Sequence, residues 1–195
     1  MHLWSFVLVM QSQDLLFLGI QTAPSLKSEQ VEFPLVLGLG FPDTKTTKTI
    51  LIRPKEDWDI FSGRDKEEDE TVLGYSKQKL SSEGLEGSDV LTEISGLLAE
   101  REAYSLWPDR DNAMLTKLDG SANGSPKVLS ALGLFNQLVS NERFISIEVR
   151  HKLVSENYPR NSADVRWMVV CYHQCWRSFS QVGEPVVPNC GLSPE

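Results

Sequence analysis

Two aspartates are candidates for chemistry in this sequence. Asp111 lies in the segment Trp107–Leu115, and Asp164 lies in the segment Tyr158–Arg166. Carboxylate oxygens are the ligands that Mg²⁺ and Mn²⁺ prefer, and two acids that a fold brings together titrate as a coupled pair. The pair therefore predicts a weak site for a divalent metal, provided that the fold brings the two carboxylates together.

Each aspartate also has a purely structural interpretation. Asp111 would be favoured by the helix dipole if it lay in the first turn of a helix. Asp164 would form an ion pair with Arg160 or Arg166 if these residues shared the start of a helix. Trp58 and Trp107 are likewise interpreted as core or turn residues rather than as platforms on which a base stacks. The sequence leaves these alternatives open for the aspartates.

The cysteines predict no disulfide framework and no zinc site. Cys171 and Cys175 are four residues apart, and His173 lies between them on a different helical face. A disulfide at this spacing would be strained, and two thiols without further ligands do not make a structural zinc site. We expect core thiols in a reducing compartment.

Three apolar runs near the N-terminus predict the strands that would position these residues. They cover Leu15–Thr22, Val31–Phe41 and Lys48–Arg53, and Pro54 ends the third run. Turn residues at short spacing separate the runs, which is typical of a meander of adjacent strands. Their continuous apolar character indicates a mixed sheet with both faces covered.

Helical spacing of apolar residues dominates the remaining sequence, apart from a short strand predicted over 103–107. Ser88 is a candidate N-cap for the first of these helical segments. The amphipathic segments are 88–100, 110–118, 128–139, 146–156 and 160–176. Strands followed by alternating helices predict an α/β fold, a mixed β-sheet flanked by helices, and the order fits a ribonuclease H-like architecture.

The length of the chain and its apolar first residues predict the domain organisation and the location of the protein. A chain of 195 residues predicts one domain, which we place at 14–177, between an N-terminal extension (1–13) and a flexible tail (178–195). The apolar first ten residues lack a charged leader and are too short to cross a bilayer, so we expect a cytoplasmic protein with no membrane partner. The alternative for the extension is a mis-assigned start, with translation beginning at Met10.

Acidic residues outnumber basic ones, but not evenly along the chain. The net charge is −8, which argues against a protein that holds nucleic acid by bulk electrostatics. Residues 56–70 hold eight acids and two bases, a local charge of −6 that predicts a solvated loop. Bases gather in the C-terminal third, where any contact with a polyanion is expected. The candidates for nucleic-acid binding are Arg143, Arg150, Lys152, Arg160 and Arg166.

Five segments in this order resemble the DEDD-type 3′–5′ exonucleases, particularly the ribonuclease T-like branch. They are Leu16–Gln21, Leu51–Trp58, Leu73–Leu80 and the two aspartate segments. The resemblance spans roughly 14–177 and is carried by the order and spacing of the segments, because each one alone is weak. It implies a ribonuclease H-like fold and two-metal chemistry, in which ions about 4 Å apart clamp the scissile phosphate.

The resemblance also implies which residues should carry the chemistry. Such enzymes use four carboxylates as metal ligands and a histidine as general base. The carboxylate positions correspond to Gly19, Gln21, Asp111 and Asp164, and the histidine position corresponds to Pro159. Two of the five functional groups are therefore kept, as catalytic remnants and as weak metal ligands at most.

This loss predicts a catalytically degenerate exonuclease-like protein that binds a protein partner or nucleic acid. Overall acidity favours the protein partner, and a homodimer stays open. We expect no cofactor in that case. The alternative is a divergent, active exonuclease on single-stranded RNA or DNA that uses Asp111, Asp164 and Mg²⁺ or Mn²⁺. A third alternative is an unrelated α/β interaction protein. Under the first hypothesis, both aspartates face Gly19 and Gln21 across one cleft.

Overall fold

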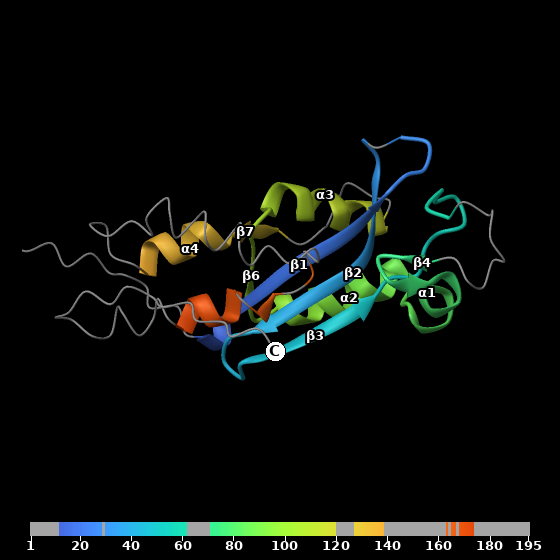
Figure 1. Ribbon diagram of the computed structural model, residues 1–195. Helices are drawn as coiled ribbons and strands as arrows, with labels where there is room; N and C mark the ends of the chain where they lie inside the picture. Colours follow the sequence, from blue (N-terminus) through green and yellow to red (C-terminus); the bar gives the residue numbers. More distant parts are fainter. Residues whose placement is uncertain are drawn as a thin grey trace, which may run out of the picture.

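The computed structural model describes residues 12–28, 30–61, 71–119, 127–138, 163, 165, 166 and 168–173. Its main feature is a five-stranded mixed sheet flanked by helices (Figure 1). The strands are β1 (Leu15–Pro24), β2 (Glu32–Phe41), β3 (Thr46–Leu51), β6 (Glu102–Ser105) and β7 (Val128–Ser130). The predicted α/β class is confirmed.

The order of the sheet is β3-β2-β1-β6-β7. The β1–β2 and β2–β3 pairs are antiparallel, whereas the β1–β6 and β6–β7 pairs are parallel. This mixed arrangement is compatible with a ribonuclease H-like fold. β1 is the central strand, and its pairing with β6 ends at Phe17 and Tyr104. The later residues of β1 therefore have no β6 neighbour.

In the described part of the chain, a small hairpin and three helices connect the strands of the sheet, and a fourth helix follows β7. The helices are α1 (Lys77–Glu83), α2 (Gly87–Leu98), α3 (Pro108–Asp119) and α4 (Ala131–Leu138), and a 3₁₀ turn, η1 (Ser12–Asp14), precedes β1. Two-residue strands β4 (Thr71–Val72) and β5 (Tyr75–Ser76) form the hairpin. The backbones of α2 and α3 approach closely, since a Cβ added at Gly87 would lie 2.7 Å from the carbonyl oxygen of Leu118.

Both faces of β1 are buried, as its continuous apolar run predicts. Leu16, Leu18 and Ile20 belong to one core cluster together with residues of α2 and α3. Leu15 and Phe17 belong to a second cluster on the opposite face. In that cluster the Phe17 ring lies 5.8 Å from the ring of Phe135 and 6.1 Å from the ring of Tyr172. Alternate residues of β1 thus serve two different cores.

Two glycines of β2 let the C-terminal part of the chain approach the second face. A Cβ added at Gly38 would lie 1.7 Å from the carbonyl oxygen of Ala163. At Gly40, an added Cβ would lie 2.9 Å from Val169 and 3.0 Å from Val165. Only glycine leaves room for backbone and side chains at these distances, so Ala163, Val165 and Val169 cover the sheet at these two positions.

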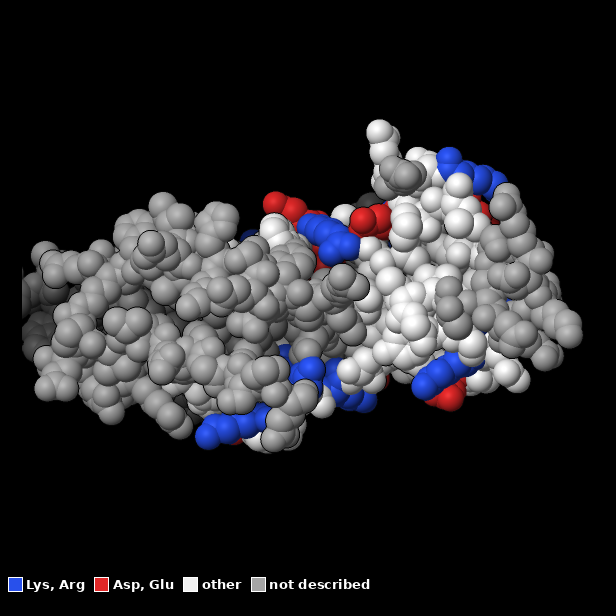
Figure 2. Space-filling view, viewed as in Figure 1, with Lys and Arg blue, Asp and Glu red and all other residues white. Residues whose placement is uncertain are grey.

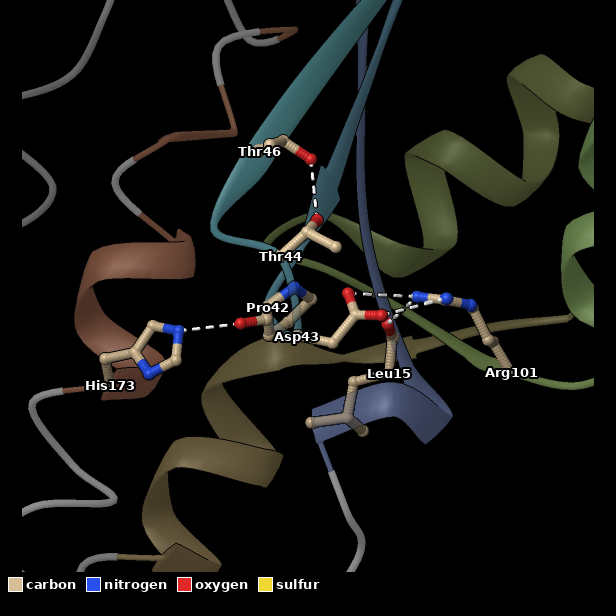
Figure 3. A network of polar contacts seen from close by, with 7 residues as sticks. All are labelled: Leu15, Pro42, Asp43, Thr44, Thr46, Arg101 and His173. Carbon is tan, nitrogen blue, oxygen red and sulfur yellow. Dashed lines mark hydrogen bonds and ion pairs between the residues drawn. The ribbon is translucent and has the colours of Figure 1, made fainter.

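A polar network fixes the other end of this C-terminal segment (Figure 3). His173 Nε2 lies 2.8 Å from the carbonyl oxygen of Pro42, in the β2–β3 turn. The guanidinium of Arg101 donates to the carboxylate of Asp43, with an Nη2–Oδ2 distance of 3.1 Å, and to the carbonyl of Leu15. The network joins the starts of β1 and β6 to the turn and to residue 173. Cys171, in the same segment, is buried, as predicted for a core position.

The structure differs from the sequence-based expectation at several boundaries. Helix α2 begins at Gly87 with Glu86 at the N-cap position, so the prediction of Ser88 as N-cap is wrong. The stretch 128–139 begins with the strand β7. This strand has only three residues, which is too short for the alternation of a strand to be recognised in the sequence. The amide side chain of Asn112 fixes β7 by bonding both Val128 N and Val128 O, at 2.9 and 3.1 Å. The hairpin β4–β5 and the helix α1 were not predicted.

Several predicted segments lie outside the described residues. They are the extension up to residue 11, the acidic loop 62–70, the loop from 120, the helix 146–156, most of 160–176 and the tail.

Candidate functional site

Gly19 and Gln21 lie in the central strand, on the sheet face against which Ala163, Val165 and Val169 lie. Gly19 pairs with Gly38 of β2, and Gln21 pairs with Val36. Side chains alternate along a strand, so both positions share a face with Phe17 of the second core. Gln21 is 7% exposed. The two positions where the resemblance expects carboxylates are therefore enclosed and carry no charge.

Asp111 lies in the first turn of α3, immediately after the carboxyl end of β6, and is 2% exposed. The hydroxyl of Ser105, the last residue of β6, donates a hydrogen bond to its carboxylate. The backbone N–H of Ile20 also donates to this carboxylate. The pairing of β1 with β6 ends before Ile20, so β6 supplies no acceptor for the Ile20 N–H. The Asp111 carboxylate accepts this hydrogen bond instead. The structure thus brings Asp111 against β1 at the residue between Gly19 and Gln21.

The electrostatic environment of Asp111 is set mainly by its burial. Burial raises the pKa of Asp111 to about 6, and the hydrogen bond from Ser105, the charge of Arg110 and the N–H of Ile20 offset only part of this rise. A carboxylate in a multi-ligand metal site would be expected to sit among further oxygen ligands. Within the described part of the chain, no group of three or more His, Cys, Asp or Glu side chains could hold a metal ion.

Asp164 lies outside the described residues, but its chain neighbours do not. The carbonyl of Ala163 lies against Gly38, which is the strand partner of Gly19. Val165 is buried and lies against Gly40. The chain on both sides of Asp164 therefore runs over the sheet face on which the Gly19 position lies.

The remaining predicted residues are mostly beyond the described ranges. Pro159, Arg143, Arg150, Lys152 and Arg160 lie outside them. Arg166 is exposed and begins the short C-terminal helical segment. On the face seen in Figure 2, the described surface carries small separate groups of basic and acidic side chains rather than one basic stripe.

A second polar network, which the sequence did not predict, borders Asp111. Arg110 donates from Nε to the carboxylate of Glu32 at 3.1 Å and from Nη2 to Thr22 Oγ1. The Thr22 hydroxyl donates to Glu32 at 2.8 Å, and Lys117 Nζ donates to the Glu32 carbonyl at 2.6 Å. Burial raises the pKa of Glu32, but the bonds from Thr22 and Arg110 and the charge of Lys117 hold it below its ordinary value. The network ties α3 to the ends of β1 and β2 nearest the site.

The two tryptophans flagged in the sequence have different environments. Trp58 is 9% exposed and stacks on Phe33 with 5.0 Å between ring centroids, which confirms a core residue. Trp107 lies in the turn between β6 and α3 and is 42% exposed. Its backbone N–H donates to Ser105 Oγ at 3.0 Å, and its carbonyl accepts from Asp111 N at 2.9 Å. The Trp107 turn is thus fixed by the same residues that hold Asp111.

Comparison of the chain with protein-family models and with curated proteins gives no match. None of the described helices is long and apolar enough to cross a membrane.

Proposed function

We propose that this chain is a catalytically degenerate 3′–5′ exonuclease-like protein that acts by binding. One observation carries the proposal: positions distant in the sequence converge on one part of the sheet. The carboxylate of Asp111 bonds the N–H of Ile20, between Gly19 and Gln21. Ala163, next to Asp164, lies against the strand partner of Gly19. This convergence supports the proposal, because a DEDD-type site requires these positions to lie close together.

The chemistry left at these positions favours binding over hydrolysis. Two divalent metals need several carboxylates to balance their charge. Gly19 supplies no ligand, Gln21 supplies a neutral amide, and Pro159 cannot act as a general base, a loss of about 10²-fold or more in rate. The Asp111 carboxylate already accepts hydrogen bonds from Ser105 and Ile20. Fewer carboxylates also repel a phosphate less, so the site can still bind a ligand after the catalytic residues are lost.

The ligand of this site is a protein partner or a single-stranded nucleic acid. A net charge of −8 favours the protein partner for the molecule as a whole. However, residues 56–70 carry −6 of that charge, which leaves the rest of the chain close to neutral. The acidity therefore does not exclude a nucleic acid at the site itself.

The second candidate is an active exonuclease with one metal held by Asp111 and Asp164, and the retained Asp111 is the observation that favours it. A nuclease assay separates the two functions. Short single-stranded RNA and DNA are incubated with Mg²⁺ or Mn²⁺ and with either the wild type or an Asp111→Asn/Asp164→Asn variant. We expect no degradation by the wild type beyond that of the double variant. Degradation that disappears in the double variant would establish a working active site and overturn the proposal.

A further inference from the structure

β3 is an outermost strand of the sheet, and its outer side lacks the usual protection of an edge (Figure 1). A bulge, a proline or a charged side chain commonly keeps an edge strand from pairing with another strand. β3 pairs with β2 over its six residues without a shift in register, and it contains no proline. The charged side chain of β3, Lys48, forms an ion pair with Glu93 of α2. This pair directs the lysine toward the helix rather than across the edge.

The backbone groups of β3 point alternately toward β2 and away from the sheet. Just past the strand, Ile52 N donates to the Leu35 carbonyl at 2.9 Å, so the even-numbered residues face β2 and the odd-numbered residues face outward. Leu85 already bonds two of the outward groups. Its N–H donates to the Leu51 carbonyl at 2.9 Å, and its carbonyl accepts from Arg53 N at 2.8 Å. The outer side of β3 therefore pairs with another backbone segment at one end, where Leu85 forms a parallel bridge.

The other end of this outer side is open in the described part of the chain. Thr47 and Thr49 direct their backbone N–H and C=O groups outward, and no described residue bonds these groups. Both side chains are exposed, and they share a sheet face with their partners Gly40 and Gly38 of β2. Outward donors and acceptors on β-branched residues form a template on which an extended peptide pairs as a further strand.

We propose that the outer side of β3 binds an extended peptide segment of a partner protein, which pairs with Thr47 and Thr49 as an added strand. β2 and β1 separate this surface from β6, which leads to Asp111. The inference therefore goes beyond the proposed function and does not depend on it. Backbone hydrogen bonds supply the affinity of such a strand, and its alternate side chains supply the specificity.

Charges along β3 favour a peptide of another protein over a second copy of this chain. The turn and strand 44–51 contain two lysines, Lys45 and Lys48, and no acid. A second β3 would bring the same two lysines against them, whereas an acid in the incoming strand would attract them. The acids in or next to α2 are Glu86, Asp89, Glu93 and Glu100. Glu86 and Glu93 pair with Arg53 and Lys48, and none of the four lies on the strand itself. We therefore expect an acidic residue in the bound segment.

The test measures the binding of labelled peptides to the full chain by fluorescence anisotropy. The probe is a short peptide of alternating threonine and valine with a glutamate at each end. Its control has the same side chains but carries methyl groups on alternate backbone nitrogens, so it cannot donate along one edge. The control should bind about 10-fold more weakly, as the loss of two or more backbone hydrogen bonds predicts. A third peptide, with lysine at each end, should bind more weakly than the glutamate peptide.

Variants of Thr49 locate the bound peptide on β3. Thr49→Pro removes an outward N–H but no bond to β2, because proline is tolerated on the free side of an edge strand. It should raise the Kd of the glutamate peptide about 5-fold or more. Thr49→Ala keeps the N–H and is the matched control, with a Kd within about 2-fold of the wild type. Circular dichroism and thermal unfolding establish that each variant is folded.

Several outcomes would overturn the inference. Equal binding of the methylated and unmodified peptides would exclude strand pairing, and this comparison stays decisive even if Thr49→Pro unfolds. A folded Thr49→Pro variant with the wild-type Kd would exclude β3 as the surface. Absence of binding of the glutamate peptide up to about 1 mM would remove the peptide ligand altogether, and tighter binding of the lysine peptide would remove the acidic one. A dimer of the free chain in analytical ultracentrifugation that Thr49→Pro dissociates would assign the edge to a second copy instead.

Discussion

Asp111 acts in this structure as part of the backbone scaffold. Its carboxylate accepts from the Ser105 hydroxyl and from the N–H of Ile20, at the point where β6 stops pairing with β1. A buried backbone donor that lacked an acceptor would be costly. The residue that resembles a metal ligand therefore has a structural task.

This structural task predicts that Asp111→Asn stabilises the protein at neutral pH. Burial raises the pKa of Asp111 to about 6, above its ordinary value. The ionised carboxylate therefore costs stability above pH 6, and the cost disappears as the pH falls below about 4. An asparagine still accepts hydrogen bonds but has no charge to desolvate. We expect the free energy of unfolding at pH 7.5 to rise by on the order of 2 kcal/mol.

Urea denaturation at pH 7.5 and at pH 4.5 checks this prediction. The stabilisation by Asp111→Asn should shrink at pH 4.5, because the wild-type carboxyl is then protonated in the folded protein. A variant that is less stable than the wild type at pH 7.5 would contradict the prediction that burial of the Asp111 charge costs stability. It would indicate instead that the carboxylate charge is needed there.

The Asp43–Arg101 pair gives a second prediction at the scale of single residues. Both side chains are about four-fifths buried, and the same Arg101 also bonds the Leu15 carbonyl. Asp43→Asn should lower the free energy of unfolding by about 1 kcal/mol, since it removes a charge-assisted bond. Glu83→Gln, which removes the exposed Lys79–Glu83 pair, is the matched control and should change it by under about 0.5 kcal/mol. Equal effects of the two variants in urea denaturation would show that Asp43 does not clamp the turn.

At the scale of elements, apolar runs were enough to predict the strands that build the sheet. β1, β2 and β3 are long, and their boundaries lie within a few residues of the predicted ones. β7 has three residues, so its existence depends on β6 and on Asn112 rather than on a pattern of its own. Gly38 and Gly40 interrupt an apolar run in the sequence, but β2 continues through both. The two glycines are explained by the tertiary contacts with Ala163, Val165 and Val169, which no local sequence pattern contains.

That contact predicts that Gly38→Ala is strongly destabilising. An added Cβ would lie 1.7 Å from the carbonyl oxygen of Ala163, so the C-terminal segment must move away from the sheet. We expect a loss of about 2–4 kcal/mol, comparable to other severe overpacking and strain. Gly96→Ala in α2 is the matched control, because nothing lies within 4 Å of an added Cβ there.

Gly96→Ala should stabilise the protein by about 0.5–1 kcal/mol through helix propensity. Urea denaturation of the two alanine variants measures both effects. A Gly38→Ala protein as stable as the wild type would mean that residue 163 does not lie on β2. The conclusion that Ala163 lies close to the strand partner of Gly19 would then also be wrong.

At the scale of the whole molecule, two cores meet on the two faces of one central strand. β1 supplies Leu16, Leu18 and Ile20 to one core and Leu15 and Phe17 to the other. The candidate site lies where this strand continues beyond β6. The order of elements in the sequence predicted the α/β class. The hydrogen bonds that hold Asp111 depend on Ser105 and on the end of the β1–β6 pairing, which sequence spacing does not reveal.

If this molecule keeps the geometry of a two-metal site without its ligands, restoring the acids should restore metal binding. Gly19→Asp/Gln21→Glu places two carboxylates on the strand that Asp111 contacts. Without metal, the added charges in an enclosed site should lower the Tm. With 10 mM Mg²⁺ and a Kd near 1 mM, binding would contribute about 1.4 kcal/mol, which raises the Tm by roughly 3–6 °C. The wild type should shift by less than about 1 °C, as expected from a site with two acids missing.

Gly19→Asn, with Gln21 unchanged, is the control that separates charge from size, because asparagine and glutamine have the shapes of aspartate and glutamate without their charges. Differential scanning fluorimetry with Mg²⁺, and with NaCl at equal ionic strength, measures the shift. If the double-acid variant folds and Mg²⁺ gives it no more stability than it gives the asparagine control, Gly19 and Gln21 do not face a latent metal site. That outcome would contradict the hypothesis of a degenerate exonuclease and favour an α/β interaction protein of unrelated origin. A shift confined to the double-acid variant would instead mean that the scaffold still positions metal ligands and that the chemistry was lost by substitution alone.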